Sequence, residues 1–381
     1  MKPLEGIKVI DFTQAHAGSL GTMLLADFGA EVIKVERPRV GDMARYWPPF
    51  KGNDSGYYAF LNRNKKSITV DTRSEEGQEL IKRLIESADV VCENFKVGNM
   101  EKFNLGYENL KKINPKIIYA SVSGYGITGP MKKYPAYDLM LQAMSGIMDM
   151  TGFEIGMPTK IGPAIGDHVS GTYMANAVCI ALLEREKSGL GQRIDIGILD
   201  TLCSILDETF RMDSEKLSDF RRIGNRDFKS TIADTFKTRD GFVTINISSS
   251  NEIKKLCEVM SLEIASIDKN KVEERLALAF KKLSKFDIED KLTNSGIACS
   301  AVRNIEEIME DKTGIYDGLF IEVEDKRIGK MIVPANPISL SKSNWNVKKV
   351  APELGEDTVE VLRDHGFSRD EINELYDSKI V

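Results

Sequence analysis

The chain has 381 residues, of which 42% are hydrophobic and 29% are charged, and its formal net charge is −6 at pH 7. This length allows two domains, each with a core of its own. The acidic balance argues against nucleic acid as the main partner, and no apolar run is long enough to span a membrane. Because Met1–Ile10 leads directly into a strand-like run without a signal peptide's apolar core, we expect a cytoplasmic protein.

The residue counts give little support for a metal, disulfide or cofactor site. The chain has five cysteines, scattered singly, and three histidines. No C-x-x-C pair is present, so neither a disulfide framework nor a zinc site is predicted. Three histidines also make an all-protein transition-metal site unexpected. We therefore expect no metal and no permanently bound cofactor.

Short strands and helices alternate through the first half of the chain. Strands are predicted at 8–12, 31–35, 67–70, 89–92 and 117–122, with helices at 20–28, 75–87 and 107–114. Such alternation predicts an α/β fold, in which helices cover a parallel sheet. In that architecture ligands bind beyond the carboxyl ends of the strands.

The character of the sequence changes after residue 137. Long helices rich in Met, Ala and Gly are predicted at 139–150 and 169–187, followed by a strand at 193–196 and a helix at 199–211. Met140, Met144 and Met148 recur at helical spacing and share one helix face. They can line a pocket for an acyl group, although core packing is the commoner use of such a stripe.

A smaller unit is predicted after a charged linker at 212–226. It begins with a hairpin at 235–246, whose turn is Arg239-Asp240-Gly241. Helices at 253–260, 271–283 and 287–294 and a strand at 297–302 follow. Two helices end the chain, at 357–365 and 368–377, and a capping box, Ser368 to Glu371, opens the second.

One glycine motif suggests a nicotinamide cofactor, but its context argues against that cofactor. Gly124–Gly129 fits G-x-G-x-x-G and follows a strand, while Glu36 ends another strand as a ribose-binding carboxylate does. However, Pro130 and Pro135 prevent a regular helix after the glycines. The acidic residue also lies upstream of the motif instead of downstream. We therefore do not predict a dinucleotide site.

Gly166-Asp167-His168 places one carboxylate where a loop meets the predicted helix 169–187. Asp is among the preferred N-cap residues, so Asp167 can be a plain helix cap. A carboxylate at such a place can also act as a nucleophile in covalent chemistry. From the residues alone, both interpretations stay open.

Several segments together resemble the class III coenzyme A transferases, the family of formyl-CoA and carnitine CoA transferases. They occur in the family's order and spacing, mostly within the first two hundred residues, and jointly they are specific. The segments are Asp11–Gly18, Leu25–Arg37, Gly41–Asp42, Asn64–Asp71, Glu93–Phe95, Ser123–Gly126 with Gly129–Pro130, Pro135–Asp138, Gly166–Asp167, Gly191–Asp195 and Pro352–Gly355.

The resemblance implies a domain organisation and an assembly. A large Rossmann-like domain, formed by both chain ends, is expected to comprise 1–211 and 332–381. The linker 212–226 then leads to an inserted small α/β domain and its return segment at 227–331. Members of the family form homodimers whose subunits interlock like rings, so we expect a homodimer.

The resemblance also implies a mechanism, in which Asp167 is the family's nucleophile. Its carboxylate attacks the donor thioester and forms a mixed anhydride. The released CoA thiolate converts this anhydride into an aspartyl-CoA thioester. The acceptor acid then attacks this thioester, and CoA is transferred to it. Coenzyme A thioester is therefore a substrate. An aspartate with an ordinary pKa near 3.9 needs no base to be ionised at neutral pH. Backbone N–H groups near Gly166, or a mobile loop, are expected to stabilise the oxyanions.

Further positions match residues that contact CoA in the family. Arg37 matches an arginine that faces phosphate, and its planar donors suit that task. In formyl-CoA transferases a glycine-rich loop of the small domain closes over the site. This chain has the serine-rich stretch 246–251 at the matching place. The remaining CoA-binding candidates, in which His16 replaces a glutamine and Arg73 a lysine, are Ala15, His16, Val70, Arg73, Asn94, Phe95, Lys102 and Tyr137.

Two alternatives remain beside CoA transfer. Acyl-CoA racemases of the same fold pair this aspartate with a histidine, but here Tyr137, with a reference pKa near 10, stands at the histidine's place. A non-catalytic acyl-CoA binding protein would not need Asp167. His168 is expected to line the pocket or to cap the helix, because adjacent residues on a helix point about 100° apart.

Overall fold

The protein is described by a computed structural model, which covers residues 2–206, 222–227, 230–262, 269–311, 314, 316–325 and 327–381. These residues fall into two units. The first takes the described residues of 1–147, 160–210 and 318–381, and the second those of 148–159 and 211–317. The predicted linker 212–226 lies outside the described residues except for its last five.

A six-stranded parallel sheet forms the centre of the first unit, with the strand order β5-β2-β1-β6-β7-β8. Counted along the chain, this is the order 3-2-1-4-5-6 that is typical of Rossmann folds. The order reverses between β1 and β6, because after β5 the chain crosses to the other side of β1. The strands are β1 (Lys8–Asp11), β2 (Glu31–Glu36), β5 (Lys66–Thr69), β6 (Val90–Glu93), β7 (Ile118–Ser123) and β8 (Arg193–Gly197).

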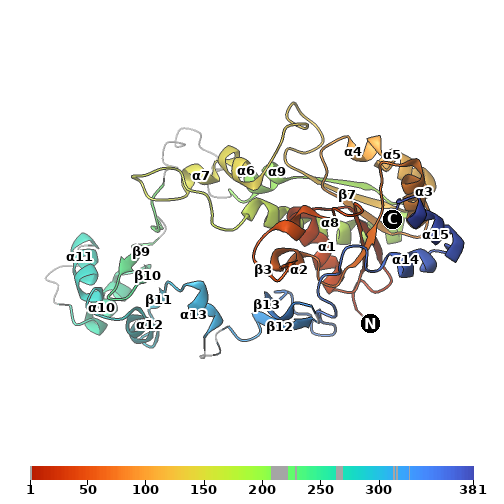
Figure 1. Ribbon diagram of the computed structural model, residues 1–381. Helices are drawn as coiled ribbons and strands as arrows, with labels where there is room; N and C mark the ends of the chain where they lie inside the picture. The colour runs from red at the N-terminus through yellow and green to blue at the C-terminus, as the bar shows by residue number, and fades with distance from the viewer. Residues whose placement is uncertain are drawn as a thin grey trace. The chain divides into compact units, whose positions relative to one another are not determined.

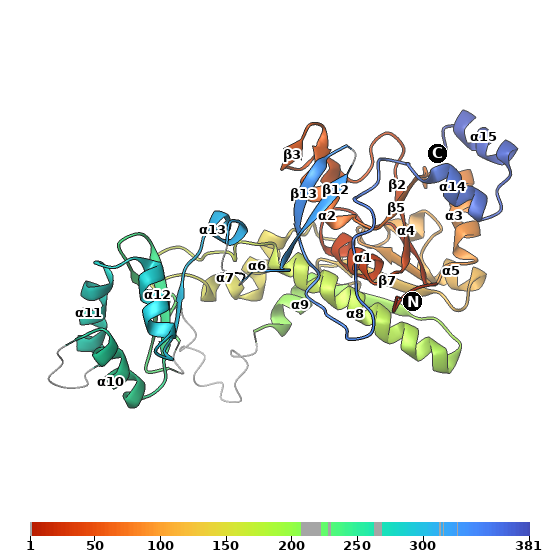
Figure 2. The same cartoon turned by 90° about the horizontal axis from the view of Figure 1, so that it is seen from below.

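Helices cover both faces of this sheet (Figure 1, Figure 2). Successive side chains of a strand point to opposite faces, so Val9 packs with one helix layer and Ile10 with the other. On one face lie α1 (Ala17–Asp27) and α8 (Ile165–Ser188). The other face is covered by α3 (Glu75–Ile85), α5 (Tyr107–Ile113), α14 (Thr358–Asp364) and α15 (Arg369–Asp377).

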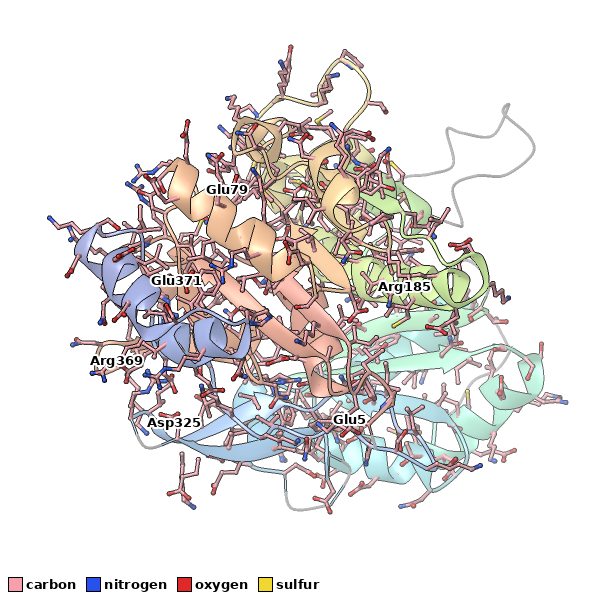
Figure 3. All side chains as sticks on the ribbon, turned by 90° about the vertical axis from the view of Figure 1, so that its right-hand side faces the viewer. Glu5, Glu79, Arg185, Asp325, Arg369 and Glu371 are labelled. Carbon is pink, nitrogen blue, oxygen red and sulfur yellow. The ribbon has the colours of Figure 1, made fainter. Side chains whose placement is uncertain are left out.

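The end of the chain returns to the first unit. Figure 3 shows α15, which carries Glu371, beside α3, which carries Glu79. Arg83 of α3 forms an ion pair of 2.8 Å with Glu371, and the Asp71 N–H donates to the Ile380 carbonyl at 2.7 Å. The predicted capping box of the last helix is confirmed, because Ser368 and Glu371 make both of its hydrogen bonds.

Several shorter elements of the first unit were not predicted. One is the antiparallel hairpin of β12 (Phe320–Asp325) and β13 (Gly329–Pro334). The others are η1 (Met43–Tyr46), β3 (Phe50–Lys51), β4 (Asp54–Ser55), α2 (Gly56–Leu61) and α4 (Asn99–Lys102). The described helices include none with the length and apolar character that crossing a bilayer requires.

The second unit contains a three-stranded antiparallel sheet, β11-β10-β9, with helices around it. The predicted hairpin is confirmed as β9 (Ile232–Lys237) and β10 (Phe242–Ile247), closed where Thr238 N–H donates to the Gly241 carbonyl at 2.9 Å. The other elements are α10 (Ser250–Val259), α11 (Lys269–Phe280), α12 (Lys285–Thr293), β11 (Ala298–Ala301) and α13 (Ile305–Met309).

Three predicted helices of the central region have different limits in the structure. The helix expected at 139–150 is two helices, α6 (Asp138–Ser145) and α7 (Ile147–Met150), because Gly146 adopts a left-handed conformation with φ of 92°. The helix expected from 169 begins at Ile165, so Asp167 lies in its first turn. The helix expected at 199–211 is α9 (Ile198–Ser204), and 207–211 lie outside the described residues.

Candidate active site

The loops after β1 and β6 meet where the strand order reverses, which is where ligands bind in open α/β sheets. Two hydrogen bonds join these loops. The Gln14 N–H donates to Asn94 Oδ1 and Asn94 Nδ2 donates to the Gln14 carbonyl, both at 2.8 Å. The side chain of Asn94 thus fixes the distance between the two strand ends.

A cleft of about 590 Å³ opens at this point. Its walls come from the loops after β1, β6 and β7, from the aromatic residues Trp47 and Tyr57, and from the start of α8. The loop segments are 14–17, 94–97 and 122–125, and the stretch 132–138 completes the wall. Asp167 is the residue that α8 contributes to the lining.

Asp167 does not cap its helix, so the interpretation of this residue as an N-cap is wrong. The N-cap of α8 is Ala164, which makes no side-chain capping bond, and Asp167 follows in the first helical turn. Among the described residues, the Asp167 carboxylate has no hydrogen-bond donor or cation within bonding distance. A half-buried carboxylate that faces a cleft without a partner is free to react with a ligand.

The neighbour Gly166 fits closely between two other helices. Its N–H donates to Asp138 Oδ1 at 2.8 Å, and the other carboxylate oxygen of Asp138 accepts from Gln142 Nε2 at 2.6 Å. A Cβ on Gly166 would lie 2.9 Å from side-chain atoms of both Asp138 and Ile198, so a larger residue would have to displace them. Asp138 therefore occupies the Gly166 N–H, and the expectation of oxyanion donors near Gly166 stays a prediction for the other backbone N–H groups there.

Burial, followed by the negative charge of Asp138, raises the pKa of Asp167 to about 7. The expectation of an ordinary pKa near 3.9 is therefore wrong. Removing a carboxylate from water disfavours its charged form, and a second carboxylate nearby adds to this effect. Around neutral pH the Asp167 carboxyl group is therefore present in both its protonated and its ionised form.

Two histidines and a tyrosine form a chain of hydrogen bonds beside Asp167. Nδ1 of His16 bonds to the Tyr57 hydroxyl, and Nε2 of His16 lies 2.8 Å from Nδ1 of His168. His16 is buried, and burial first, then the charge of His168, lowers the pKa of His16 to about 4. Burial also lowers the pKa of His168. Both rings are therefore neutral at pH 7.

A buried ion pair holds the loop after β1, which lines the cleft. Ala15 has a φ of 60°, which is unusual for a residue with a Cβ. Its N–H donates to Asp42 Oδ1 at 3.0 Å, and Asp42 Oδ2 lies 2.8 Å from the Lys34 Nζ. Lys34 also donates to the Thr13 carbonyl at 2.6 Å. These bonds hold the loop after β1 in a conformation that costs free energy by itself.

The cleft brings together six of the predicted site residues, which come from separate parts of the sequence. His168 was expected to line the pocket or to cap the helix, and it does neither. Its ring contacts His16, which itself lines the cleft. The residues in the cleft are Ala15, His16, Asn94, Phe95, Tyr137 and Asp167.

Four predicted CoA-binding residues lie outside the lining of the cleft. Val70 is 2% exposed and packs in the core on the face of the sheet that α3, α5, α14 and α15 cover. Only its backbone can therefore contact a ligand. Arg73 is exposed and pairs with Asp71 at 2.6 Å. Arg37 and Lys102 are exposed, and neither side chain has an ion pair among the described residues.

The prediction missed three lysines that line the cleft, Lys96, Lys132 and Lys133. In the part of the chain that the structure describes, none of them has a carboxylate partner. The adjacent pair Lys132-Lys133, one residue after Gly129-Pro130, was a visible signal for an anion site. Trp47 and Tyr57 were also missed, because an isolated aromatic residue at the end of a short helix or within one carries no such signal.

The G-x-G-x-x-G segment does not open a helix, which agrees with the rejection of a dinucleotide site. After β7 the chain forms turns and bends until α6 begins at Asp138. The Glu36 carboxylate is also occupied, because it binds the Arg45 guanidinium at 2.6 Å and accepts from Ser67 Oγ at 2.7 Å. No ribose hydroxyl is needed to satisfy it.

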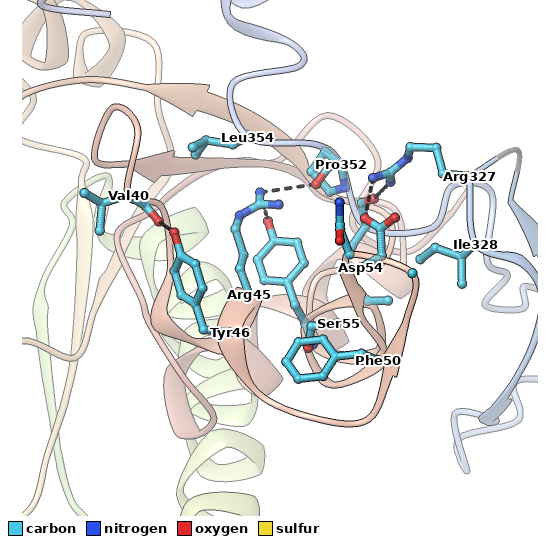
Figure 4. Close-up of a pocket in the computed structure, with 15 residues that line it drawn as sticks. Val40, Arg45, Tyr46, Phe50, Asp54, Ser55, Arg327, Ile328, Pro352 and Leu354 are labelled. Atoms are coloured by element: carbon cyan, nitrogen blue, oxygen red, sulfur yellow. Dashed lines mark hydrogen bonds and ion pairs between the residues drawn. The ribbon is translucent and has the colours of Figure 1, made fainter.

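A second hollow of about 400 Å³ lies elsewhere in the first unit (Figure 4). Two arginines line it, but both already have partners. Arg327 binds Asp54 at 3.0 Å, and Arg45 binds Glu36 and the Pro352 carbonyl. Since its cations are neutralised, this hollow is a poorer place for an anionic ligand than the cleft at Asp167.

The methionine stripe does not form a continuous wall. Gly146 separates Met148 from the helix that carries Met140 and Met144. These two side chains are exposed, so the core-packing interpretation is wrong for them, and neither lines the cleft. The serine-rich stretch 246–251 ends β10 and starts α10, where Ser249 forms a capping box with Glu252.

Comparison with known proteins identifies the family. The model of CoA-transferase family III matches residues 4–358. Human succinyl-CoA:glutarate CoA-transferase is 34% identical over 377 residues, 96% of this chain and 86% of that protein. Formyl-CoA:oxalate CoA-transferase of a Bradyrhizobium strain is 33% identical over 413 residues, which cover 99% of this chain and 97% of that protein.

A solved structure supports the same relationship. The crystal structure of a CAIB/BAIF family protein from Brucella suis superimposes with a TM-score of 0.85 at 32% sequence identity, covering 96% of this chain and 99% of that one. The parallel sheet, the cleft at its strand ends and the matches over nearly the whole chain lead to one conclusion. The chain belongs to CoA-transferase family III, a family of enzymes that transfer CoA between acyl-CoA and acids.

Proposed function

We propose that the protein transfers CoA from an acyl-CoA to a free carboxylic acid through Asp167. The Asp167 carboxylate attacks the thioester carbonyl and expels CoA thiolate, which leaves a mixed anhydride. The thiolate attacks the aspartyl carbonyl, releases the donor acid and leaves an aspartyl-CoA thioester. The acceptor carboxylate attacks this thioester and frees the thiolate again, which takes the acceptor's acyl group and restores Asp167.

The state of the Asp167 carboxylate is the observation that carries this proposal. It faces the cleft, it lacks a hydrogen-bond partner among the described residues, and its pKa is raised to about 7. Desolvation makes the ionised form more reactive toward a carbonyl carbon. One substrate is a thioester and the other is a carboxylate. The Asp167 carboxylate can therefore take the place of the substrate acid, and the energy of the thioester bond is retained in the aspartyl intermediate.

The cations around the cleft suit the phosphates of coenzyme A. We assign this role to Lys96, Lys132 and Lys133, which line the cleft without a carboxylate partner among the residues described. Arg37, exposed and directly after β2, remains a candidate through the family resemblance. Asn94 and Phe95 are expected to contact the pantetheine and the adenine.

A homodimer, with interlocked subunits as the resemblance implies, is part of the proposal. Its support in this chain is an apolar stripe on the exposed face of α8. Tyr173, Ile180 and Leu183 are 47%, 60% and 68% exposed, and their spacing places them on one side of the helix. Apolar side chains gathered on one helix face mark a surface that another chain covers.

The test replaces the nucleophile. Asp167→Ala should reduce CoA transfer to the background rate, measured by mass spectrometry with a panel of acyl-CoA donors and short, branched and aromatic acids. Wild type treated with donor and hydroxylamine should carry a hydroxamate on Asp167. The matched control is Asp200→Asn, which also changes an aspartate in the first turn of a helix but does not line the cleft.

Each alternative predicts a different outcome. Normal turnover by Asp167→Ala would refute the mechanism. Exchange of the α-proton with deuterated solvent, without CoA transfer, would show a racemase. Binding of acyl-CoA with neither reaction would show a non-catalytic binding protein.

A further inference from the structure

Counting hydrogens constrains the chain of Tyr57, His16 and His168. A neutral imidazole carries one N–H and a phenol carries one O–H, so the three groups hold three hydrogens. Two of these hydrogens make the bonds between His16 and its two neighbours. One hydrogen is therefore left over, and it must point outward from one end of the chain.

The two possible arrangements differ in what Tyr57 offers. If the His16 Nδ1–H donates to the Tyr57 oxygen, His168 must donate from its own Nδ1, and the Tyr57 hydrogen points away from His16. If Tyr57 donates to His16 instead, both histidines carry their hydrogen on Nε2. The two rings therefore share the same tautomer and change it together.

The cleft needs a hydrogen-bond donor that the backbone near Asp167 does not fully supply. Attack on a thioester builds negative charge on an oxygen, and fixed donors must stabilise that charge. The Gly166 N–H is occupied by Asp138. Tyr57 lines the cleft with Asp167, and its hydroxyl has no bond other than that with His16 among the described residues.

We propose that Tyr57 donates to the oxyanion formed at Asp167, and that His16 and His168 are positioning residues which set the direction of its O–H bond. The inference rests on the proposed acyl transfer. In the reactive arrangement both rings carry their hydrogen on Nδ1, so Tyr57 accepts from His16 and donates into the cleft. In the other arrangement Tyr57 presents a lone pair, and the oxyanion loses this donor.

The surroundings of the two rings support the proposal. Burial keeps both imidazoles neutral by lowering their pKa values, and the count of hydrogens depends on that neutrality. Burial first, then the charges of Asp167, Asp138 and Asp42, raises the pKa of Tyr57 to about 12. Tyr57 therefore keeps its hydrogen at every pH at which the enzyme is expected to work.

Kinetics of single and double variants test the proposal. Tyr57→Phe should lower kcat by about 10²-fold, the order found when one oxyanion donor is removed, with little change in the KM for acyl-CoA. His168→Phe breaks the bond to His16 and should lower kcat by a smaller factor. If His168 acts through Tyr57, adding His168→Phe to Tyr57→Phe should cost nothing further. Multiplying effects would overturn the proposal.

Nuclear magnetic resonance on ¹⁵N-histidine-labelled wild type gives a second test that needs no substrate. The chain has three histidines, and His365→Asn identifies the signals of the third. His16 and His168 should be neutral at pH 7 and share one tautomer. Different tautomers, or a charged ring, would overturn the proposal.

The two tests separate this inference from the proposed function. If Asp167→Ala keeps normal turnover, the acyl-transfer mechanism fails, whatever the tautomers are. If Asp167→Ala is inactive while Tyr57→Phe transfers CoA at the wild-type rate, only the inference about Tyr57 fails.

Discussion

Asp167 is subject to two opposing requirements. A reactive carboxylate must be ionised and poorly solvated, but an ionised carboxylate in a half-buried cleft reduces the stability of the fold. The neighbouring charge of Asp138 increases this cost. The residue is therefore expected to be destabilising for the folded protein and necessary for its activity.

Replacing Asp167 with asparagine should stabilise the protein, and the effect should depend on pH. The pKa of Asp167 is about 7 in the folded protein, against an ordinary value of 3.8, so between these values the folded state binds more protons than the unfolded state. The stability of wild type therefore falls as the pH rises through this window. Above pH 7, Asp167→Asn should be more stable by about 1–3 kcal/mol.

Denaturant unfolding of both proteins at pH 5 and pH 8 measures this difference. The gain should be larger at pH 8, and Asp200→Asn, on the neighbouring helix, should show no comparable change. A gain of the same size at both pH values would contradict the raised pKa. It would point to a packing effect of the amide instead.

The sequence identified Asp167 through its motif but not through its environment. Its raised pKa depends first on burial and then on the charge of Asp138, which belongs to another segment of the sequence. The contact of His168 with His16 was likewise hidden, because the two residues are 152 positions apart in the sequence and lie at the starts of different helices. Contacts between distant segments decide both properties.

At the scale of elements, α1 and α8 determine the geometry of the site. His16 is the N-cap of α1, and Asp167 and His168 lie in the first turn of α8. The two helices touch at glycines, where a Cβ on Gly171 would lie 2.4 Å from the Ala17 carbonyl oxygen. This close approach holds the histidines within hydrogen-bond distance.

Gly171→Ala should therefore separate the two helices. The obstacle is backbone, which moves less easily than a side chain, so we expect a loss of about 1–3 kcal/mol in stability. The His16–His168 bond should lengthen, and kcat should fall. Urea unfolding and steady-state kinetics measure both effects. Glu186→Ala, at an exposed position of α8 outside the apolar stripe, is the matched control. An unchanged Gly171→Ala enzyme would contradict the role of the helix contact.

The strands and helices around the main sheet were largely predictable because their side chains repeat with clear periods. The start of α8 was missed, because Ile165 and Gly166 lie outside the small-residue pattern that follows. The β12–β13 hairpin was also missed, although Ile321 and Val323 alternate with exposed glutamates. Its strands carry few buried residues, so its hydrophobic signal is weak.

At the scale of the whole molecule, the folded chain unites segments from both ends. Arg63 binds Asp27 at 2.6 Å and also donates to the Pro334 carbonyl at 3.1 Å. Asn336 adds a bond to the same aspartate at 3.3 Å. The buried charge of Asp27 thus connects the N-terminal half with the returning segment, and both are needed for the sheet to be covered.

The apolar stripe on α8 predicts how the purified protein assembles. Wild type should sediment as a dimer, at about twice the chain mass of 42.6 kDa. Replacing Ile180 and Leu183 together with glutamate should weaken the dimer by about tenfold or more, because burying unpaired carboxylates is costly. Sedimentation velocity measures this, with Glu184→Gln as the control on the same helix. A wild-type monomer would contradict the prediction.

Trp47 gives the cleft an optical property of its own. The chain has two tryptophans, and Trp47 lines the cleft with its ring 5.4 Å from that of Tyr57. A ligand that enters the cleft changes the polarity around this indole, whereas Trp345 lies on another segment of the chain. Replacing Trp345 with phenylalanine leaves a single emitter, whose fluorescence follows the arrival and departure of substrates during turnover.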